Sequence, residues 1–142
     1  MLNFKQIVTG TITGAITLQV AGYLIFDVVL RDFYLDNVGF AIDAFRAGTV
    51  IWALALANLS FSALITLYVI NNPGALTVRR GFVTGFVVGF LVWFGIDSTT
   101  YALTHLWSLT ILIVNPVMAA IHNGIAGGAI AFVLIKITKK LE

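Results

Sequence analysis

Four long apolar runs constrain the fold of this chain more than any other feature of its sequence. They extend over residues 7–30, 47–70, 81–103 and 109–135, with polar or turn residues at their boundaries. A helix needs about 20 mostly apolar residues to cross the hydrocarbon core of a bilayer. The runs do not alternate apolar and polar residues as the strands of a membrane barrel do. We therefore expect one transmembrane domain, residues 1–142, folded as an all-α, four-helix transmembrane bundle.

The composition supports a membrane location and excludes several kinds of chemistry. Hydrophobic residues make up 60% of the chain and charged residues only 10%, whereas soluble domains carry about 25% charged residues. Such a chain has too little polar surface for a water-facing globule, which nearly rules out a soluble enzyme. Cysteine is absent, so disulfides, thiolate nucleophiles and Cys-ligated metals are excluded. A net charge of +2 gives no reason to expect a nucleic-acid partner.

The link between the first two runs, residues 31–46, has a helical pattern of its own. Its apolar positions fall on one helical face: Tyr34, Val38, Ala41, Ile42 and Phe45. The opposite face carries Asp32, Asp36, Gly39, Asp43 and Arg46. This spacing predicts an outer amphipathic interfacial helix that lies in the headgroup layer. It caps the bundle or offers a docking face to a partner.

The basic residues predict the orientation of the chain in the membrane. Four spans place both termini and the second loop on one side, which holds Lys5, Arg79, Arg80, Lys136, Lys139 and Lys140. The opposite side holds only Arg31 and Arg46. Cytoplasmic loops of membrane proteins are enriched in Lys and Arg. We expect a multi-pass protein of the cell membrane, inner or plasma, with both termini in the cytoplasm.

Glycines four residues apart occur in three of the four runs. They are Gly10 and Gly14, then Gly81, Gly85 and Gly89, and finally Gly124 and Gly128. Small residues at this spacing let two helix backbones approach closely. They serve either packing within the bundle or self-association of the chain.

Polar side chains inside the runs form the candidate site. An ionisable group inside a bilayer is costly and therefore needs a reason. An outer layer contains Asp27, Asp97, Thr99, Thr100 and Asn115, and a deeper layer contains Gln19, Asn58 and His122. Gln19, Tyr23 and Asp27 form one helical ridge because they are four residues apart. Together these residues predict a polar pocket that opens toward the outer side and is closed below.

Each ionisable group also has a simple structural interpretation. Asp27 would pair with Arg31 or reach up toward water. Asp97 would bond to the neighbouring hydroxyls of Ser98, Thr99 or Thr100, and His122 would bond to Asn58 or Gln19. The alternative is that Asp27 and Asp97 face each other. Two close carboxylates do not both ionise easily, so one would keep a proton. Such a pair suits proton coupling, cation binding or acid–base catalysis.

Cofactor chemistry has little support in the sequence. His105 lies at the outer turn and His122 lies deep in the fourth run, so the two differ in depth by roughly 16 Å and one haem iron cannot bridge them. No close His, Glu and Asp spacing suggests a metal site. We expect no cofactor and no metal. The aromatic residues near the outer boundary, Trp52, Trp107, Tyr34 and Tyr101, are interpreted as interfacial anchors.

The same outer residues resemble an uncharacterised family of small four-helix predicted membrane proteins, a domain of unknown function. The family pattern of an intramembrane Asp, then Phe-Tyr, then Gly is matched by Asp27, Phe33, Tyr34 and Gly39. Its Asp-x-Thr-x-x-Ala segment with a later Trp is matched by Asp97, Thr99, Ala102 and Trp107. The chain departs from the pattern at Ile96, at Asn115 in place of an acid, and at Met118 and Ala119. The resemblance implies fold and topology and supplies no activity.

Three functional hypotheses follow. The first is a non-catalytic accessory or stabilising subunit of a larger membrane complex, or a homo-oligomer, whose partners are the lipid bilayer and another membrane protein or a second copy. The second is a small-molecule or proton-coupled transporter that uses Asp27 and Asp97. The third is an intramembrane enzyme acting on a lipid-like substrate. Only the third predicts an apolar ligand in the outer pocket. The sequence leans away from an enzyme and does not separate the three.

Overall fold

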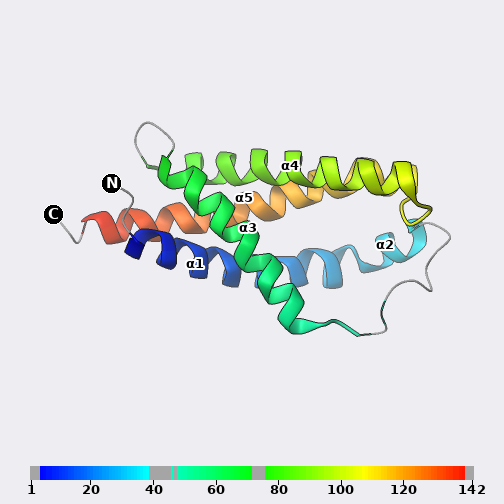
Figure 1. Ribbon diagram of the computed structural model, residues 1–142, viewed down its shortest axis with the longest axis horizontal. Coiled ribbons are helices and arrows are strands. Elements are labelled where there is room, and N and C mark those ends of the chain that lie inside the picture. Colours follow the sequence, from blue (N-terminus) through cyan, green and yellow to red (C-terminus); the bar gives the residue numbers. More distant parts are fainter. Residues whose placement is uncertain (1–3, 39–45, 47, 72–75, 140–142) are drawn as a thin grey trace.

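The computed structural model describes residues 4–38, 46, 48–71 and 76–139, and these residues are almost entirely helical (Figure 1). The chain forms α1 (Phe4–Gly22), η1 (Tyr23–Val29), α2 (Arg31–Asn37), α3 (Ile51–Asn71), α4 (Val78–Leu103) and α5 (Leu109–Lys139). Four helical stretches are long and apolar enough to cross a membrane: Phe4–Val29, Ile51–Asn71, Val78–Leu103 and Leu109–Thr138. The predicted all-α bundle with four spans is confirmed.

The bundle is built on the antiparallel pair of α4 and α5, which lie side by side along their lengths (Figure 1). The helix α1 packs against α5, and α3 crosses α1 obliquely. The N-terminal end of α1 and the C-terminal end of α5 are adjacent, because Gln6 Nε2 donates to Thr138 Oγ1 at 3.2 Å. The start of α1 and the end of α5 therefore share one end of the bundle, where α3 ends and α4 begins, and α2 lies at the other end (Figure 1).

Glycine makes the close approach of α4 and α5 possible. A Cβ placed on Gly89 would lie 2.5 Å from the Cβ of Asn123, and one on Gly127 would overlap the carbonyl oxygen of Gly81. Real Cβ atoms do not come this close, so these positions have no room for a side chain. The ridge of Gly10 and Gly14 faces Thr66 and Ser62 of α3 in the same way. The glycine ridges are thus used for packing within the chain, one of the two predicted roles.

The predicted interfacial helix is shorter than residues 31–46. The helix α2 ends at Asn37, and Val38 has extended backbone angles (φ −63°, ψ 150°). Val38 instead forms an isolated antiparallel bridge with Trp107 at the α4–α5 turn. Residues 39–45, which the pattern also placed in the helix, lie outside the described residues. The polar face is as predicted over α2, since Asp32 and Asp36 are exposed.

Local capping explains where the helix pair begins and turns. The Thr77 side chain accepts from the backbone N–H of Arg80 at 3.2 Å and starts α4. At the start of α5, the Ser108 hydroxyl accepts from the N–H of Ile111 at 3.3 Å. Side chains at these positions satisfy N–H groups that have no partner inside the helix. The short turn between Leu103 and Leu109 therefore folds α4 and α5 into a tight hairpin.

Candidate functional site

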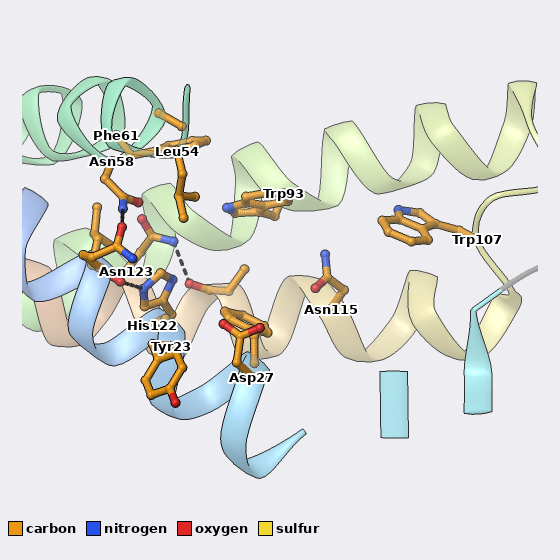
Figure 2. Close-up of a pocket in the computed structure, with 16 residues that line it drawn as sticks. Tyr23, Asp27, Leu54, Asn58, Phe61, Trp93, Trp107, Asn115, His122 and Asn123 are labelled. Atoms are coloured by element: carbon orange, nitrogen blue, oxygen red, sulfur yellow. Dashed lines mark hydrogen bonds between the residues drawn. The ribbon is translucent and has the colours of Figure 1, made fainter. Parts of the chain in front are cut away.

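A cavity of about 420 Å³ lies between η1, α3 and α5, on the α2 side of the bundle centre (Figure 2). Its inner wall is α5, where Asn115, Ala119 and Asn123 are buried. Its outer rim carries the exposed side chains of Tyr23, Asp27 and Leu54. We call this cavity the intramembrane pocket, because its rim residues belong to helices long enough to span the bilayer.

Most of the pocket wall is apolar or aromatic. Aromatic rings come from four parts of the chain: Tyr23 and Phe26 of η1, Phe61 of α3, Trp93 of α4 and Trp107 of the turn. Phe61 and Trp93 stack with their ring centres 5.7 Å apart, which joins α3 to α4. A cavity of a few hundred Å³ with apolar walls and a few polar groups is the usual form of a small-molecule site.

At the end of the pocket farther from α2, one polar pair joins α1 to α3. Asn58 Nδ2 donates to Gln19 Oε1 at 2.8 Å, and both residues line the pocket (Figure 2). Amide hydrogen bonds of this kind hold neighbouring helices together in lipid. The sequence placed both residues in the candidate pocket, and the structure does so too.

His122 lies beside this pair and contacts the backbone of α1. Its Nε2 is 2.8 Å from the carbonyl oxygen of Leu18. A carbonyl only accepts, so Nε2 carries the proton that makes this bond. Gly22 permits the approach, since a Cβ there would lie 3.1 Å from the same nitrogen. The prediction that His122 bonds to Asn58 or Gln19 is wrong, because those two amides bond to each other.

The helix geometry changes at this point from α to π. Tyr23–Val29 form a π-helix, and its closing bond runs from the N–H of Leu30 to the carbonyl of Ile25 at 2.9 Å. The wider turn is rare, is mostly limited to short insertions in α-helices, and occurs frequently at functional sites. Here the π-helical segment supplies Tyr23, Phe26 and Asp27 to the pocket wall.

Asp97 is fully buried behind the pocket and both of its oxygens accept hydrogen bonds. The indole Nε1 of Trp107 donates to Oδ1 at 3.0 Å, and Asn115 Nδ2 donates to Oδ2 at 2.7 Å. Trp107 and Asn115 also line the pocket, whereas Asp97 does not. The carboxyl group therefore supports the pocket wall through Trp107 and Asn115 and does not itself line the cavity.

The network continues from Asn115 out of the membrane span to α2. The Tyr34 hydroxyl donates to Asn115 Oδ1 at 2.7 Å, and the Ser108 hydroxyl donates to the carbonyl of Asn37. Burial, and then the nearby carboxylate of Asp97, raise the pKa of Tyr34 to about 12. The phenol therefore remains protonated, and remains a donor, throughout the physiological range. These bonds fix α2 over the outer end of the α4–α5 hairpin.

The close pair of Asp27 and Asp97 is not formed. Asp97 is held by Trp107 and Asn115, whereas Asp27 is exposed at the pocket rim. Among the described residues Asp27 makes no ion pair, so its expected bond to Arg31 is also absent. Asp97 does not bond to the neighbouring hydroxyls, because Thr99 and Thr100 donate to the carbonyls of Gly95 and Ile96, each at 2.9 Å.

Of the nine candidate residues, six line the pocket: Gln19, Tyr23, Asp27, Asn58, Asn115 and His122. Thr99 and Thr100 do not, because each hydroxyl is used by its own helix. Sequence reasoning missed Trp93 and Asn123, and it treated Trp107 and Tyr34 as interfacial anchors. The contact between Asp97 and Trp107 had a signal in the sequence, because the two residues are only ten positions apart with a short turn between them. Such a turn brings the residues that follow it back beside the end of the preceding helix.

The part of the chain that the structure describes contains no cluster of side chains that would bind a metal ion. No three His, Cys, Asp or Glu side chains come together there. The polar groups of the pocket are instead amides, one imidazole and one rim carboxylate. Such groups orient a ligand by hydrogen bonding and charge.

Comparisons with known protein families, with curated proteins and with solved structures find no match to this chain. The fold and the geometry of the site therefore carry the functional argument. Four residues of the pattern noted above, Tyr34, Asp97, Trp107 and the substituted Asn115, form one hydrogen-bonded network. Residues spread over 81 positions of the chain thus meet at a single place.

Proposed function

We propose that this integral membrane protein binds a small, lipid-like molecule that enters the intramembrane pocket from the bilayer. The observation that carries the proposal is the pocket itself, which has aromatic walls and a few polar groups and lies between helices long enough to span a membrane. A ligand with an apolar body and one polar group would find partners for both parts. The binding step is common to a transporter and to an intramembrane enzyme, two of the functions that the sequence left open.

The π-helical turn supports a binding role. Hydrogen bonding in a π-helix is less favourable than in an α-helix, so such turns are retained mainly where they position a functional group. The turn in this chain forms the rim of the pocket, and its Tyr23 and Asp27 are exposed there. A chain selected only for a stable bundle would gain nothing from this geometry.

The role of accessory subunit has less support. The sequence suggested it through small size, the absence of catalytic motifs and packing surfaces rich in glycine and aromatic residues. Gly81, Gly85 and Gly89 face α5, and Gly10 and Gly14 face α3, all within one chain. The exposed apolar side chains that remain lie on membrane-spanning helices, where lipid covers them.

The proposed orientation places the pocket near the outer face of a cell membrane. The end of the bundle with α2 carries Arg31, and the opposite end carries Lys5, Arg79, Arg80 and Lys136. This distribution favours cytoplasmic termini. A ligand would then enter from the outer part of the bilayer, and labelling of a Cys introduced at Asp36 from outside intact cells tests this orientation.

The test of binding compares two alanines of α3. Ala57 lines the pocket, and Ala55 is exposed without lining it. Protein extracted from its own membranes in mild detergent should carry a small apolar molecule, detected by native mass spectrometry. Ala57→Phe should fill part of the cavity and remove that molecule, whereas Ala55→Phe should retain it. A wild-type chain without any such molecule, or equal occupancy in both variants, would contradict the proposal.

A further inference from the structure

From the charge of the pocket we infer the class of its ligand, an inference that rests on the proposed function. We propose that the pocket recognises a lipophilic organic cation, a molecule with an aromatic or aliphatic body and one positive nitrogen, and that Asp27 is its counter-ion. The argument has three parts: the unbalanced carboxylate at the rim, the aromatic walls and the absence of competing cationic side chains.

Asp27 is the one carboxylate among the residues that line the pocket, and the described lining contains no Lys or Arg. It makes no ion pair with any described residue, although Arg31 lies only four positions further along the chain. It lies within the span Phe4–Val29, where an unpaired charge is unfavourable. A cationic ligand at the rim would supply the missing opposite charge.

The aromatic walls fit the same ligand. Five rings, those of Tyr23, Phe26, Phe61, Trp93 and Trp107, line one cavity. The face of an aromatic ring attracts a cation, and Trp is the most effective ring. Trp107 also donates its N–H to the buried carboxyl group of Asp97, and a bond to that acceptor increases the electron density of the indole. An apolar body would pack on these rings while its charge stays near Asp27.

An inorganic cation fits the site less well. Ca²⁺ takes about six to eight oxygen ligands, and in the described chain no group of three acidic or imidazole side chains exists. The wall beyond Asp27 offers mainly rings and aliphatic groups. This chemistry favours a weakly hydrated organic ammonium or pyridinium over a metal ion.

The test uses two probes of equal shape, N-benzylpyridinium and its neutral isostere diphenylmethane. The full chain carries Trp52→Phe, which leaves only Trp93 and Trp107 as indoles, both in the pocket. In phosphatidylcholine nanodiscs, quenching of these indoles by the pyridinium reports binding. Diphenylmethane is added as a competitor that relieves the quenching. Asp27→Asn removes the charge, and Asp36→Asn is the matched control because Asp36 is exposed on α2 outside the pocket lining.

We expect saturable quenching that Asp27→Asn weakens about tenfold and Asp36→Asn leaves unchanged. Diphenylmethane at a given concentration should relieve the quenching less in the parent chain than in Asp27→Asn, because only the parent holds the cation by charge. Equal cation affinity in the parent and Asp27→Asn would overturn the inference. If diphenylmethane still competes in that case, the pocket binds apolar molecules and the proposed function survives. Absence of both quenching and competition would overturn the inference as well, and the molecule that co-purifies with the protein then decides the proposed function separately.

Discussion

The indole of Trp107 donates its N–H to the fully buried carboxyl group of Asp97 at 3.0 Å, and the same tryptophan lines the intramembrane pocket. A residue of the α4–α5 turn thus links a buried acid to the pocket. The bond crosses the α4–α5 turn, so it stabilises the hairpin and fixes the position of one pocket wall.

Replacing Trp107 by Phe should destabilise the protein by about 1–3 kcal/mol, because it leaves one oxygen of the buried Asp97 without a donor. Unfolding in mixed micelles of a mild detergent and SDS measures the change. Trp52→Phe is the control, since the Trp52 side chain is 70% exposed and its replacement should change stability by less than about 0.5 kcal/mol. Equal stability of the two variants would show that the bond to Asp97 contributes nothing.

Replacing Gly89 by Ala should also destabilise the bundle, by about 1–3 kcal/mol, although alanine favours helix. The added Cβ would lie 2.5 Å from that of Asn123 in α5. Gly95 lies on the same helix and has nothing within 4 Å of its added Cβ. Gly95→Ala should therefore be neutral or stabilising by up to about 1 kcal/mol. Opposite signs for the two variants in one unfolding assay are the expected result.

The pKa of Tyr34 should lie above that of an ordinary tyrosine. Burial and the nearby Asp97 raise its pKa to about 12, whereas an unperturbed phenol titrates near about 10. The folded state then holds the proton longer than the unfolded state, so stability should be constant below about pH 10 and fall from there to about pH 12. The ultraviolet absorbance difference between wild type and Tyr34→Phe after a rapid pH jump isolates this phenol. A midpoint near 10 would contradict its placement.

His122 should carry a proton on Nε2. The Leu18 carbonyl oxygen 2.8 Å from Nε2 requires a donor at that atom. The chain has only two histidines, so nitrogen-15 spectra of His-labelled protein in micelles resolve both, and His105→Gln assigns them. A proton on Nδ1 alone would exclude the contact with α1.

The spans and their packing were predictable because they depend on composition along each helix. An apolar run of about 20 residues in a bilayer has few alternatives to a spanning helix. Glycines four residues apart allow α4 and α5 to approach closely. Gln19, Tyr23 and Asp27 all line the pocket, although Tyr23 and Asp27 lie in the π-helix, where residues four apart no longer share one α-helical face.

The errors arose where one side chain chooses among several partners. Thr99 and Thr100 bond to their own helix because a carbonyl four residues earlier is always within reach. Asp97 took the indole and the amide across the turn, a choice that depends on the geometry of the hairpin. No sequence pattern pointed to the π-helical turn of η1.

The most direct test of a pocket open to lipid is photocrosslinking from its mouth. Leu54 lines the pocket, and Leu56 on the same helix faces outward with its side chain 56% exposed. Benzoylphenylalanine placed at either position would be irradiated in native membranes and its adducts identified by mass. We predict a distinct small molecule captured at position 54 and only bulk phospholipid at position 56. The same phospholipid mixture, in the same proportions, at both positions would contradict a specific intramembrane binding site.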